Sequence, residues 1–307
     1  GWPLNVFLTP DLEPFWGGSY FRKQQFLDIL GQIRAVWEKE PETISQLVQN
    51  YFLENKVAIY LPAYNGELKI CQVFERIPAF IRDNAEEIYV VDNQSKDRTA
   101  EVVRKYAEGN SLKHLNVYTM EANIGYGGSQ KWAYRYAIEK GYDTVIMLHC
   151  DAQYAPEDAP RLLELLINSG SGMVFGSRFR GSPLAGGMPL IRFLGVHFLN
   201  FMQNFILQWD LSEYTSGYRI YQMKVLEEIP FELCNNYYHF DTEILIQFKL
   251  RGIPIEEDVI ETTYADEENY VNIYKNGFLI LGTLGRYLLN KWGIKKSQMF
   301  NIQHRSE

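Results

Sequence analysis

The stretch VIMLHCDAQY, residues 145–154, carries three side chains that could bind a metal ion. An apolar run of strand type ends at His149, and Asp151 and Gln153 follow at every second position. Side chains two apart in an extended chain point the same way, so these three groups converge if the extended conformation continues. Imidazole, carboxylate and amide oxygen can all bind Mn²⁺ or Mg²⁺. The alternative is that His149 only ends a buried strand.

Segments of strand and helix type alternate around this stretch. The strand-type runs VAIYLPAYN, EIYVVDNQS and LNVYTMEAN alternate with predicted helices at Leu68–Asn84, Asp97–Glu108 and Gly125–Lys140. Such alternation predicts an α/β fold with a mainly parallel central sheet and flanking helices. Ligands bind these sheets beyond the carboxyl ends of the strands. Polar residues stand at those ends: Tyr64, Asn65, Asp92, Asn93, Asn123, His149, Asp151 and Gln153.

Composition restricts the class of protein. The 307 residues are 46% hydrophobic, which is enough for one large domain or two modest ones. The net charge is -8, and no cluster of Lys or Arg could follow a phosphate backbone, so no nucleic-acid partner is expected. Cys71, Cys150 and Cys234 form no CxxC pair, which argues against disulfides or structural zinc and favours a reducing, cytoplasmic compartment.

Polar residues interrupt the apolar segments. In PLIRFLGVHFLNFMQNFILQW the interruptions include Arg192, His197 and Gln203, so the run does not read as a membrane span. We expect a helix with one broad apolar face that packs on the core. The same is expected of the amphipathic, basic-ended LILGTLGRYLLNKWGIKK. Peripheral contact with the inner face of a membrane is the alternative use of these helices.

The first 52 residues differ in pattern from the rest. GWPLNVFLTP and EPFWGGSYF predict two strands around a turn at Asp11, followed by a helix from about Gln25 to Tyr51. This β-β-α segment, residues 1–52, resembles the C-terminal half of a thioredoxin-like domain of the spermatogenesis-associated class. The CxxC of such a domain is absent here, so no thiol oxidoreductase activity is expected. The chain begins at Gly1 rather than Met, which leaves room for an upstream segment.

Seven segments in order resemble one enzyme family: LPAYNGE, VVDNQSKDRT, NIGYGGSQKWAY, HCDAQYAPED, GSRF, EYTSGYRIY and FDTEI. They are similar to family 2 glycosyltransferases with the GT-A nucleotide-sugar-binding fold, near the dolichyl-phosphate sugar synthases. The resemblance runs from about Lys56 to Leu281 and implies a domain at 56–290 with a tail at 291–307. It also implies an inverting, metal-assisted transfer of a sugar from a nucleoside diphosphate-sugar to a polyprenyl phosphate or a glycan hydroxyl. UDP is expected as the donor nucleotide before GDP.

The resemblance assigns roles to individual residues. The family's Asp-x-Asp motif aligns with residues 149–151, which implies that Asp151, Gln153 and, as a substitute for carboxylate, His149 bind Mn²⁺ or Mg²⁺. The implied nucleotide-sugar contacts are Pro62, Tyr64, Glu67, Asp92, Asn123, Gly127, Asp151, Arg178 and Arg219. The turn around Gly127 precedes a helix and would aim backbone N–H groups at an anion.

Structural alternatives exist for several of these residues. Asp92 could form an Asx turn with Ser95, and Arg178 could belong to a surface ion pair. Glu67 is displaced by one position relative to the family pattern, where Gly66 follows the Asn. Asn93 stands where a second Asp is often found, which removes charge but keeps the shape.

Asp241 and Glu243 are the candidates for a catalytic base. A hydroxyl acceptor needs such a base, with Asp241 the first choice and Glu243 the reserve, whereas a phosphate acceptor needs none. The alternative is that Asp241 caps a helix. The segment TYADEENYVNIYKNG replaces a basic motif of the lipid-phosphate branch, which weakens transfer of that branch's acceptor. The rival function is a sugar-nucleotide-binding module without turnover, because Gly66, Asn93 and His149 depart from the family pattern.

Overall fold

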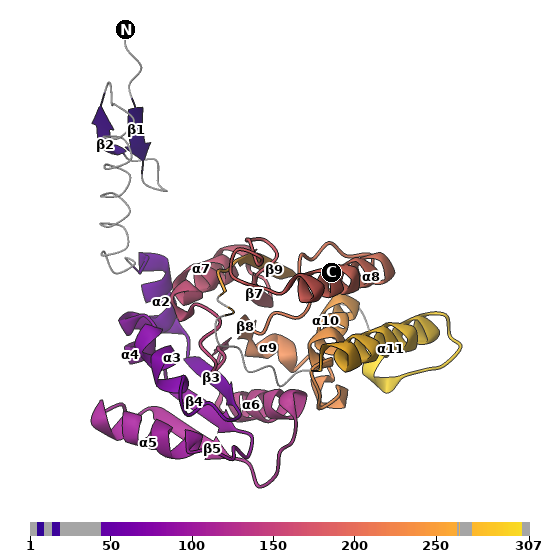
Figure 1. The fold of residues 1–307 in the computed structure, drawn as a ribbon, viewed down its shortest axis with the longest axis horizontal. Coiled ribbons are helices and arrows are strands. Elements are labelled where there is room, and N and C mark those ends of the chain that lie inside the picture. The colour runs from indigo at the N-terminus through magenta and orange to yellow at the C-terminus, as the bar shows by residue number, and fades with distance from the viewer. Residues whose placement is uncertain (1–4, 9–13, 19–43, 263, 265–271, 303–307) are drawn as a thin grey trace. The chain divides into compact units, whose positions relative to one another are not determined.

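The computed structural model describes residues 5–8, 14–18, 44–262, 264 and 272–302. The chain divides into two compact units, residues 1–43 and 44–307. In the first unit, β1 (Asn5–Leu8) pairs antiparallel with β2 (Pro14–Gly18), which confirms the two predicted strands (Figure 1). The predicted turn at Asp11 and the predicted helix start at Gln25 lie outside the described residues.

The second unit is built on a seven-stranded sheet with the order β5-β4-β3-β6-β8-β7-β9. Its strands are β3 (Val57–Ala63), β4 (Glu87–Asp92), β5 (Leu115–Thr119), β6 (Thr144–Met147), β7 (Met173–Ser177), β8 (Arg219–Gln222) and β9 (Ile255–Val259). Only β8 runs antiparallel to its neighbours β6 and β7, while the remaining pairs are parallel. The predicted α/β fold with a mainly parallel sheet is therefore confirmed.

The register brings the expected functional positions to one edge of the sheet. Ala63 at the end of β3 pairs with Asp92 at the end of β4. Met147 at the end of β6 pairs with Arg219, the first residue of the antiparallel β8. Because β8 begins where β6 and β7 end, the loops after β3, β4, β6 and β7 and the loop before β8 meet at this edge.

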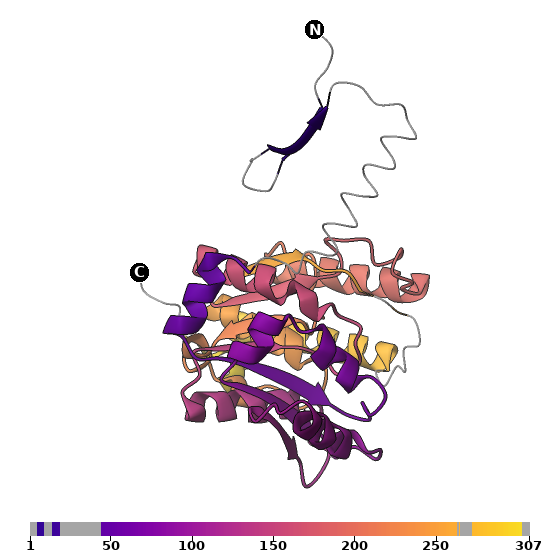
Figure 2. The same ribbon diagram turned by 90° about the vertical axis from the view of Figure 1, so that its left-hand side faces the viewer.

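Helices cover both faces of the sheet (Figures 1 and 2). They are α2 (Gln46–Glu54), α3 (Ile70–Arg76), α4 (Ala79–Asn84), α5 (Thr99–Gly109), α6 (Tyr126–Lys140), α7 (Ala159–Ser169), α8 (Leu190–Leu207), α9 (Met223–Leu226), α10 (Phe240–Arg251) and α11 (Ile273–Lys291), with single 3-10 turns at Pro156–Asp158, Phe231–Leu233 and Gln298–Phe300. Alternate strand residues enter two separate cores. Ile59 packs with α3, α4 and α7, and its neighbour Tyr60 packs with α6 and α10.

The helix predicted at Leu68–Asn84 is two helices, so that expectation was wrong. Proline disfavours helical backbone in the residue before it, and Ile77 accordingly has φ -65 and ψ 126. The chain resumes as α4 with Pro78 at its N-cap. This break shortens α3 and turns the chain before β4.

The described end of the predicted N-terminal helix belongs to the second unit. Helix α2 begins after Ser45, whose side chain accepts a hydrogen bond from the Val48 N–H. Val48 is fully buried, and the Tyr51 hydroxyl lies 2.7 Å from Thr144 Oγ1 in β6. Residues from Ile44 onward are thus part of the sheet domain, whereas the domain boundary predicted near residues 52–56 stays a prediction.

Helix α8 does not pack its apolar face on the core, so that expectation was also wrong. Among the described residues, α8 is the one helix long and apolar enough to cross a membrane by length and composition. Its buried residues are Asn200, Gln203 and Leu207, and six of its large apolar side chains are exposed: Leu190, Ile191, Leu194, Phe198, Phe201 and Phe205.

Candidate active site

The chain turns at the end of β6 rather than continuing as a strand. The strand ends at Met147, and Ala152 has a φ of 58, in the left-handed region. His149, Asp151 and Gln153 therefore do not alternate along one extended segment, and the extended conformation predicted for them was wrong. The Asp151 carboxylate accepts the Gln153 N–H at 3.1 Å, which closes the turn.

His149 is half-buried among aromatic side chains. Its Nε2 is 3.4 Å from the Tyr126 hydroxyl, and its ring makes an edge contact with Tyr154 at 5.2 Å between centroids. The backbone of Gly217 lies so close that a Cβ there would overlap Nε2. Burial lowers the pKa of His149, which the nearby Asp151 carboxylate offsets in part. The imidazole is thus neutral near pH 7 and has one ring nitrogen with a lone pair.

Asp241 lies in the first turn of α10 and is almost fully buried. Its Oδ1 is 3.2 Å from Arg219 Nη1 and 3.3 Å from Gln130 Nε2. No side chain caps α10, so the capping alternative does not describe Asp241. Burial raises the pKa of the Asp241 carboxyl, and Arg219 and Gln130 counter that shift only in part.

Tyr126 joins the two groups. Its hydroxyl is near Nε2 of His149. It also interacts with the Asp241 carboxylate and thereby offsets part of the rise in the pKa of Asp241 that burial causes. Its ring stacks on Tyr238, with centroids 5.0 Å apart. Side chains from α6, β8, α10 and the β6 turn thus meet at the edge where the strands end. Sequence reasoning missed Tyr126 and Gln130, although both belong to the run NIGYGGSQ that it singled out.

Arg219 and Arg178, both predicted to contact phosphate, are buried and held by protein groups. Although burial by itself disfavours a charged guanidinium, the Asp241 carboxylate raises the pKa of Arg219. Arg178 donates from Nε to Glu213 at 2.8 Å and from Nη1 to the Tyr264 hydroxyl at 3.2 Å. Because Glu213 is fully buried too, this is not the surface ion pair considered above. A phosphate contact by either arginine stays a prediction.

The loops after β3 and β4 are bound to each other. The Asn65 N–H donates to Ser95 Oγ at 2.9 Å, and the Glu67 carboxylate accepts Arg98 Nη2 at 2.6 Å. Asp92 is buried at the end of β4 and accepts the Ser95 N–H at 3.0 Å, as an Asx turn would. Pro62 within β3 and Tyr64 directly after it were also predicted to contact the nucleotide-sugar. Both side chains are half-buried.

The N-terminus of α6 is occupied by the protein itself. The N–H groups of Gly127 and Gly128 donate to the Asn236 carbonyl at 2.8 and 3.3 Å, so the expectation that they face an anion was wrong. A Cβ at Gly127 would overlap the Asn235 carbonyl oxygen, and glycine is required for this close approach. Asn123 accepts from Asn93 Nδ2 at 3.1 Å and from the Gly125 N–H at 3.0 Å, which fixes the turn before the helix.

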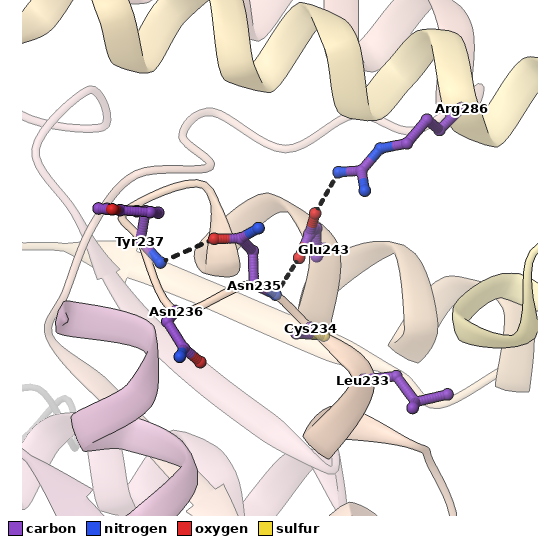
Figure 3. A pocket seen from close by; sticks show the side chains of 7 residues that line it. All are labelled: Leu233, Cys234, Asn235, Asn236, Tyr237, Glu243 and Arg286. Carbon is purple, nitrogen blue, oxygen red and sulfur yellow. Dashed lines mark hydrogen bonds and ion pairs between the residues drawn. The ribbon is translucent and has the colours of Figure 1, made fainter. Parts of the chain in front are cut away.

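Glu243, the reserve base, points away from Asp241. It accepts the Asn235 N–H at 2.6 Å and Arg286 Nη2 at 2.5 Å (Figure 3). It lines a cavity of about 390 Å³ with the segment 233–237 and Arg286. Residues two apart on a helix face different sides, which separates Glu243 from the cluster around Arg219.

The sheet, its one antiparallel strand and the polar cluster at the strand ends define a GT-A nucleotide-sugar-binding fold. Residues 58–230 match the family described as Glycosyl transferase family 2, which is more than half of the chain. The chain therefore belongs to glycosyltransferase family 2 and is a glycosyltransferase.

Two relatives and one solved structure illustrate the similarity. The chain is 26% identical over 226 residues to the UDP-N-acetylglucosamine–dolichyl-phosphate N-acetylglucosaminyltransferase of Methanococcus voltae, which covers 68% of this chain and 86% of that protein. It is 25% identical over 215 residues to the undecaprenyl-phosphate mannosyltransferase of Micrococcus luteus, covering 69% and 85%. Glucosyl-3-phosphoglycerate synthase of Mycobacterium tuberculosis, solved with Mn²⁺, UDP-glucose and phosphoglyceric acid, shares the fold with a TM-score of 0.56 at 20% identity, covering 83% and 86%.

The N-terminal segment matches a second family. Residues 1–55 match a thioredoxin-type family described as Protein of unknown function, DUF255. This agrees with the thioredoxin-like resemblance of residues 1–52.

The turn after β6 fits a divalent cation through its chemistry. The half-buried imidazole of His149 and the carboxylate of Asp151 are a nitrogen and an oxygen donor two residues apart, and the absence of a side chain at Gly217 leaves space for the imidazole. In the part of the chain that the structure describes, no three His, Cys, Asp or Glu side chains form a complete cation site. Binding of a cation by His149, Asp151 and Gln153 stays a prediction.

Proposed function

We propose that the protein transfers a sugar, with inversion, from a nucleoside diphosphate-sugar to a polyprenyl phosphate, with a glycan hydroxyl as the alternative acceptor. One observation supports this transfer most strongly. Asp241 from α10 and His149 from the turn after β6 are far apart in the chain, but Tyr126 contacts both of them. They lie at the edge of the sheet where ligands bind in such folds. The relatives named for dolichyl phosphate and undecaprenyl phosphate support the lipid-phosphate acceptor.

Different residues are proposed to bind the metal, bind the nucleoside and position the base. His149 and Asp151, with Gln153, would hold Mn²⁺ or Mg²⁺, which would neutralise the departing diphosphate. The loops at Pro62–Glu67, Asp92 and Asn123 are proposed to hold the nucleoside, with UDP expected first because the solved relative contains UDP-glucose. Arg219 positions the Asp241 carboxylate, since the two groups are 3.2 Å apart.

The buried position of Asp241 favours a hydroxyl acceptor. A buried carboxylate with a raised pKa suits a general base, because a hydroxyl must lose its proton as it attacks the sugar. A phosphate monoester attacks as an anion and needs no such group. The reaction is expected on the cytoplasmic side of a membrane when the acceptor is a lipid.

Transfer to lipid is tested directly with radiolabelled UDP-sugars and GDP-sugars, Mn²⁺ and polyprenyl phosphate in detergent. The proposal predicts label in the organic phase with one donor, and loss of that label with a chelator. Label that appears only on an added glycan would select the hydroxyl acceptor. Absence of transfer to lipid, glycan and water would overturn the proposal.

A further inference from the structure

Helix α8 turns its polar side inward. Asn200 donates from Nδ2 to the Ser212 carbonyl at 2.8 Å, and Gln203 accepts the Thr242 hydroxyl at 2.9 Å. Asn204 accepts the Tyr214 hydroxyl at 2.7 Å. A helix on a water-exposed surface ordinarily does the reverse and buries its apolar stripe.

The outward side of α8 is a continuous apolar surface. It consists of Leu190, Ile191, Leu194, Phe198, Phe201 and Phe205, which are 55–71% exposed and which we call the docking face. Their spacing follows the helical repeat, so they form one stripe along the whole helix. Contiguous exposed surface of this kind marks a site of contact with a membrane or another protein.

Helix α8 is fixed to the domain, which determines how it can meet a membrane. Crossing a bilayer would break the hydrogen bonds of Asn200, Gln203 and Asn204 and place these groups in hydrocarbon. The helix can instead lie parallel to a membrane with only its docking face inserted.

The charge around the docking face identifies the occupant. Helix α11 packs against α8, and Phe278 in α11 is 76% exposed. Residues 190–207 and 273–296 contain none of the 38 acidic residues of a chain with net charge -8, but they contain Arg192, Lys275, Arg286, Lys291, Lys295 and Lys296. Exposed Trp292 and Ile294 stand among the last three lysines. Apolar and aromatic side chains flanked by lysine match an anionic lipid surface.

We propose that the docking face, together with the basic end of α11, seats the protein on an anionic lipid bilayer with α8 parallel to the membrane plane. The inner side of α8 bonds to Thr242, the chain neighbour of Asp241. The bilayer and the candidate site thus lie on opposite sides of one helix. If the acceptor is a lipid phosphate, which rests on the function proposed above, docking brings the lipid headgroups close to the site.

Vesicle sedimentation of the full chain tests the surface. The probe is vesicles of equal parts phosphatidylcholine and phosphatidylglycerol, compared with phosphatidylcholine alone. The variant Phe198→Gln/Phe201→Gln/Phe205→Gln removes apolar contact, and Leu53→Gln/Leu68→Gln is the matched control because Leu53 and Leu68 are 84% and 85% exposed elsewhere. Since three inserted aromatic rings are lost, the partition coefficient of the triple variant should fall at least ~10-fold, while the control equals the parent.

The charge dependence is a second measurement. The variant Lys291→Gln/Lys295→Gln/Lys296→Gln should bind anionic vesicles more weakly and neutral vesicles as the parent does, and high salt should have the same effect. A parent that stays in the supernatant, or a triple phenylalanine variant that sediments like the parent, overturns the proposal. The proposal is also overturned if the parent is a dimer in solution and the phenylalanine substitutions make it monomeric, because the docking face would then bind a second copy of the chain. Donor turnover without vesicles reports the proposed chemistry separately.

Discussion

Arg219 Nη1 lies 3.2 Å from Asp241 Oδ1, and both side chains are nearly inaccessible to solvent. The sequence predicted separate roles for them, a phosphate contact for Arg219 and a base for Asp241. As an ion pair they form one unit, in which the guanidinium compensates the buried carboxylate and fixes its orientation. Gln130 and Tyr126 also contact the Asp241 carboxylate, so an acceptor that uses Asp241 as its base would have to approach between these side chains.

Replacement of Asp241 distinguishes the two acceptor classes. With a hydroxyl acceptor, Asp241→Asn should lower kcat by about two to four orders of magnitude, the usual effect of losing a positioned base, with donor affinity nearly unchanged. Steady-state kinetics and donor titration measure both quantities. Near-normal turnover would instead indicate a phosphate acceptor or Glu243 as the base.

The raised pKa of Asp241 predicts how activity depends on pH. If Asp241 is the base, kcat/KM should fall on the acid side with an apparent pKa above the ordinary value of 3.8, because only the carboxylate accepts a proton. An acid limb at the ordinary value would contradict the assignment. The Asn variant should lose this limb.

The same shift affects stability with a defined sign. The native state holds the Asp241 proton more tightly than the unfolded chain, so this group stabilises the fold below the unfolded pKa and the contribution is lost as pH rises through the native pKa. Relative to Asp241→Asn, the parent should therefore lose unfolding free energy over that range. Urea unfolding of both proteins across the range measures the difference.

Gly217 is predicted to be essential for the position of His149. In Gly217→Ala the new methyl group would overlap Nε2 of His149 and displace the ring, so kcat/KM should fall by about 100-fold, as displacements of about 1 Å in an active site can cause. Gly282→Ala in α11 is the control, because a Cβ there meets no atom within 4 Å. Equal activity of the two variants would show that the imidazole has no role.

Metal dependence tests the residues of the β6 turn. Asp151→Ala should abolish metal-dependent donor binding, whereas His149→Asp should retain it and shift the preference from Mn²⁺ toward Mg²⁺, since carboxylate is the harder ligand. Calorimetric titration of the donor with each metal gives the affinities. If Asp151→Ala binds donor as the parent does, His149, Asp151 and Gln153 have only a structural role in the turn after β6.

Two truncations test the role of the N-terminal segment. Removal of residues 1–43 should leave donor binding and the melting temperature of the sheet domain unchanged, because the compact second unit begins at Ile44. Removal of residues 1–55 should destabilise it, since Val48 and the bond from Tyr51 to Thr144 are lost. Loss of donor binding in a folded 44–307 protein would assign the first segment a part in the site.

Local patterns in the sequence predicted the strands and the sheet edge at which the polar residues gather. Both predictions depend only on residues close together in the chain, namely those of each strand and those at its carboxyl end. They did not predict the pairing of Arg178 with Glu213 or the Asn236 carbonyl at the N-terminus of α6, which arise from tertiary contacts. Helix α8 was predicted as amphipathic, but its apolar face was wrongly predicted to pack on the core. Hydrogen bonds of Asn200 and Gln203 to distant segments decide the orientation of the helix.

Release of nucleoside diphosphate from UDP-sugars and GDP-sugars in the presence of Mn²⁺ is the most direct test of whether this site catalyses transfer. Chromatographic quantification should show nucleoside diphosphate formed slowly with water alone, faster with polyprenyl phosphate or a glycan, and not at all in Asp151→Ala. Donor that stabilises the protein against heat but yields no nucleoside diphosphate under any of these conditions would contradict catalysis and identify a sugar-nucleotide-binding module.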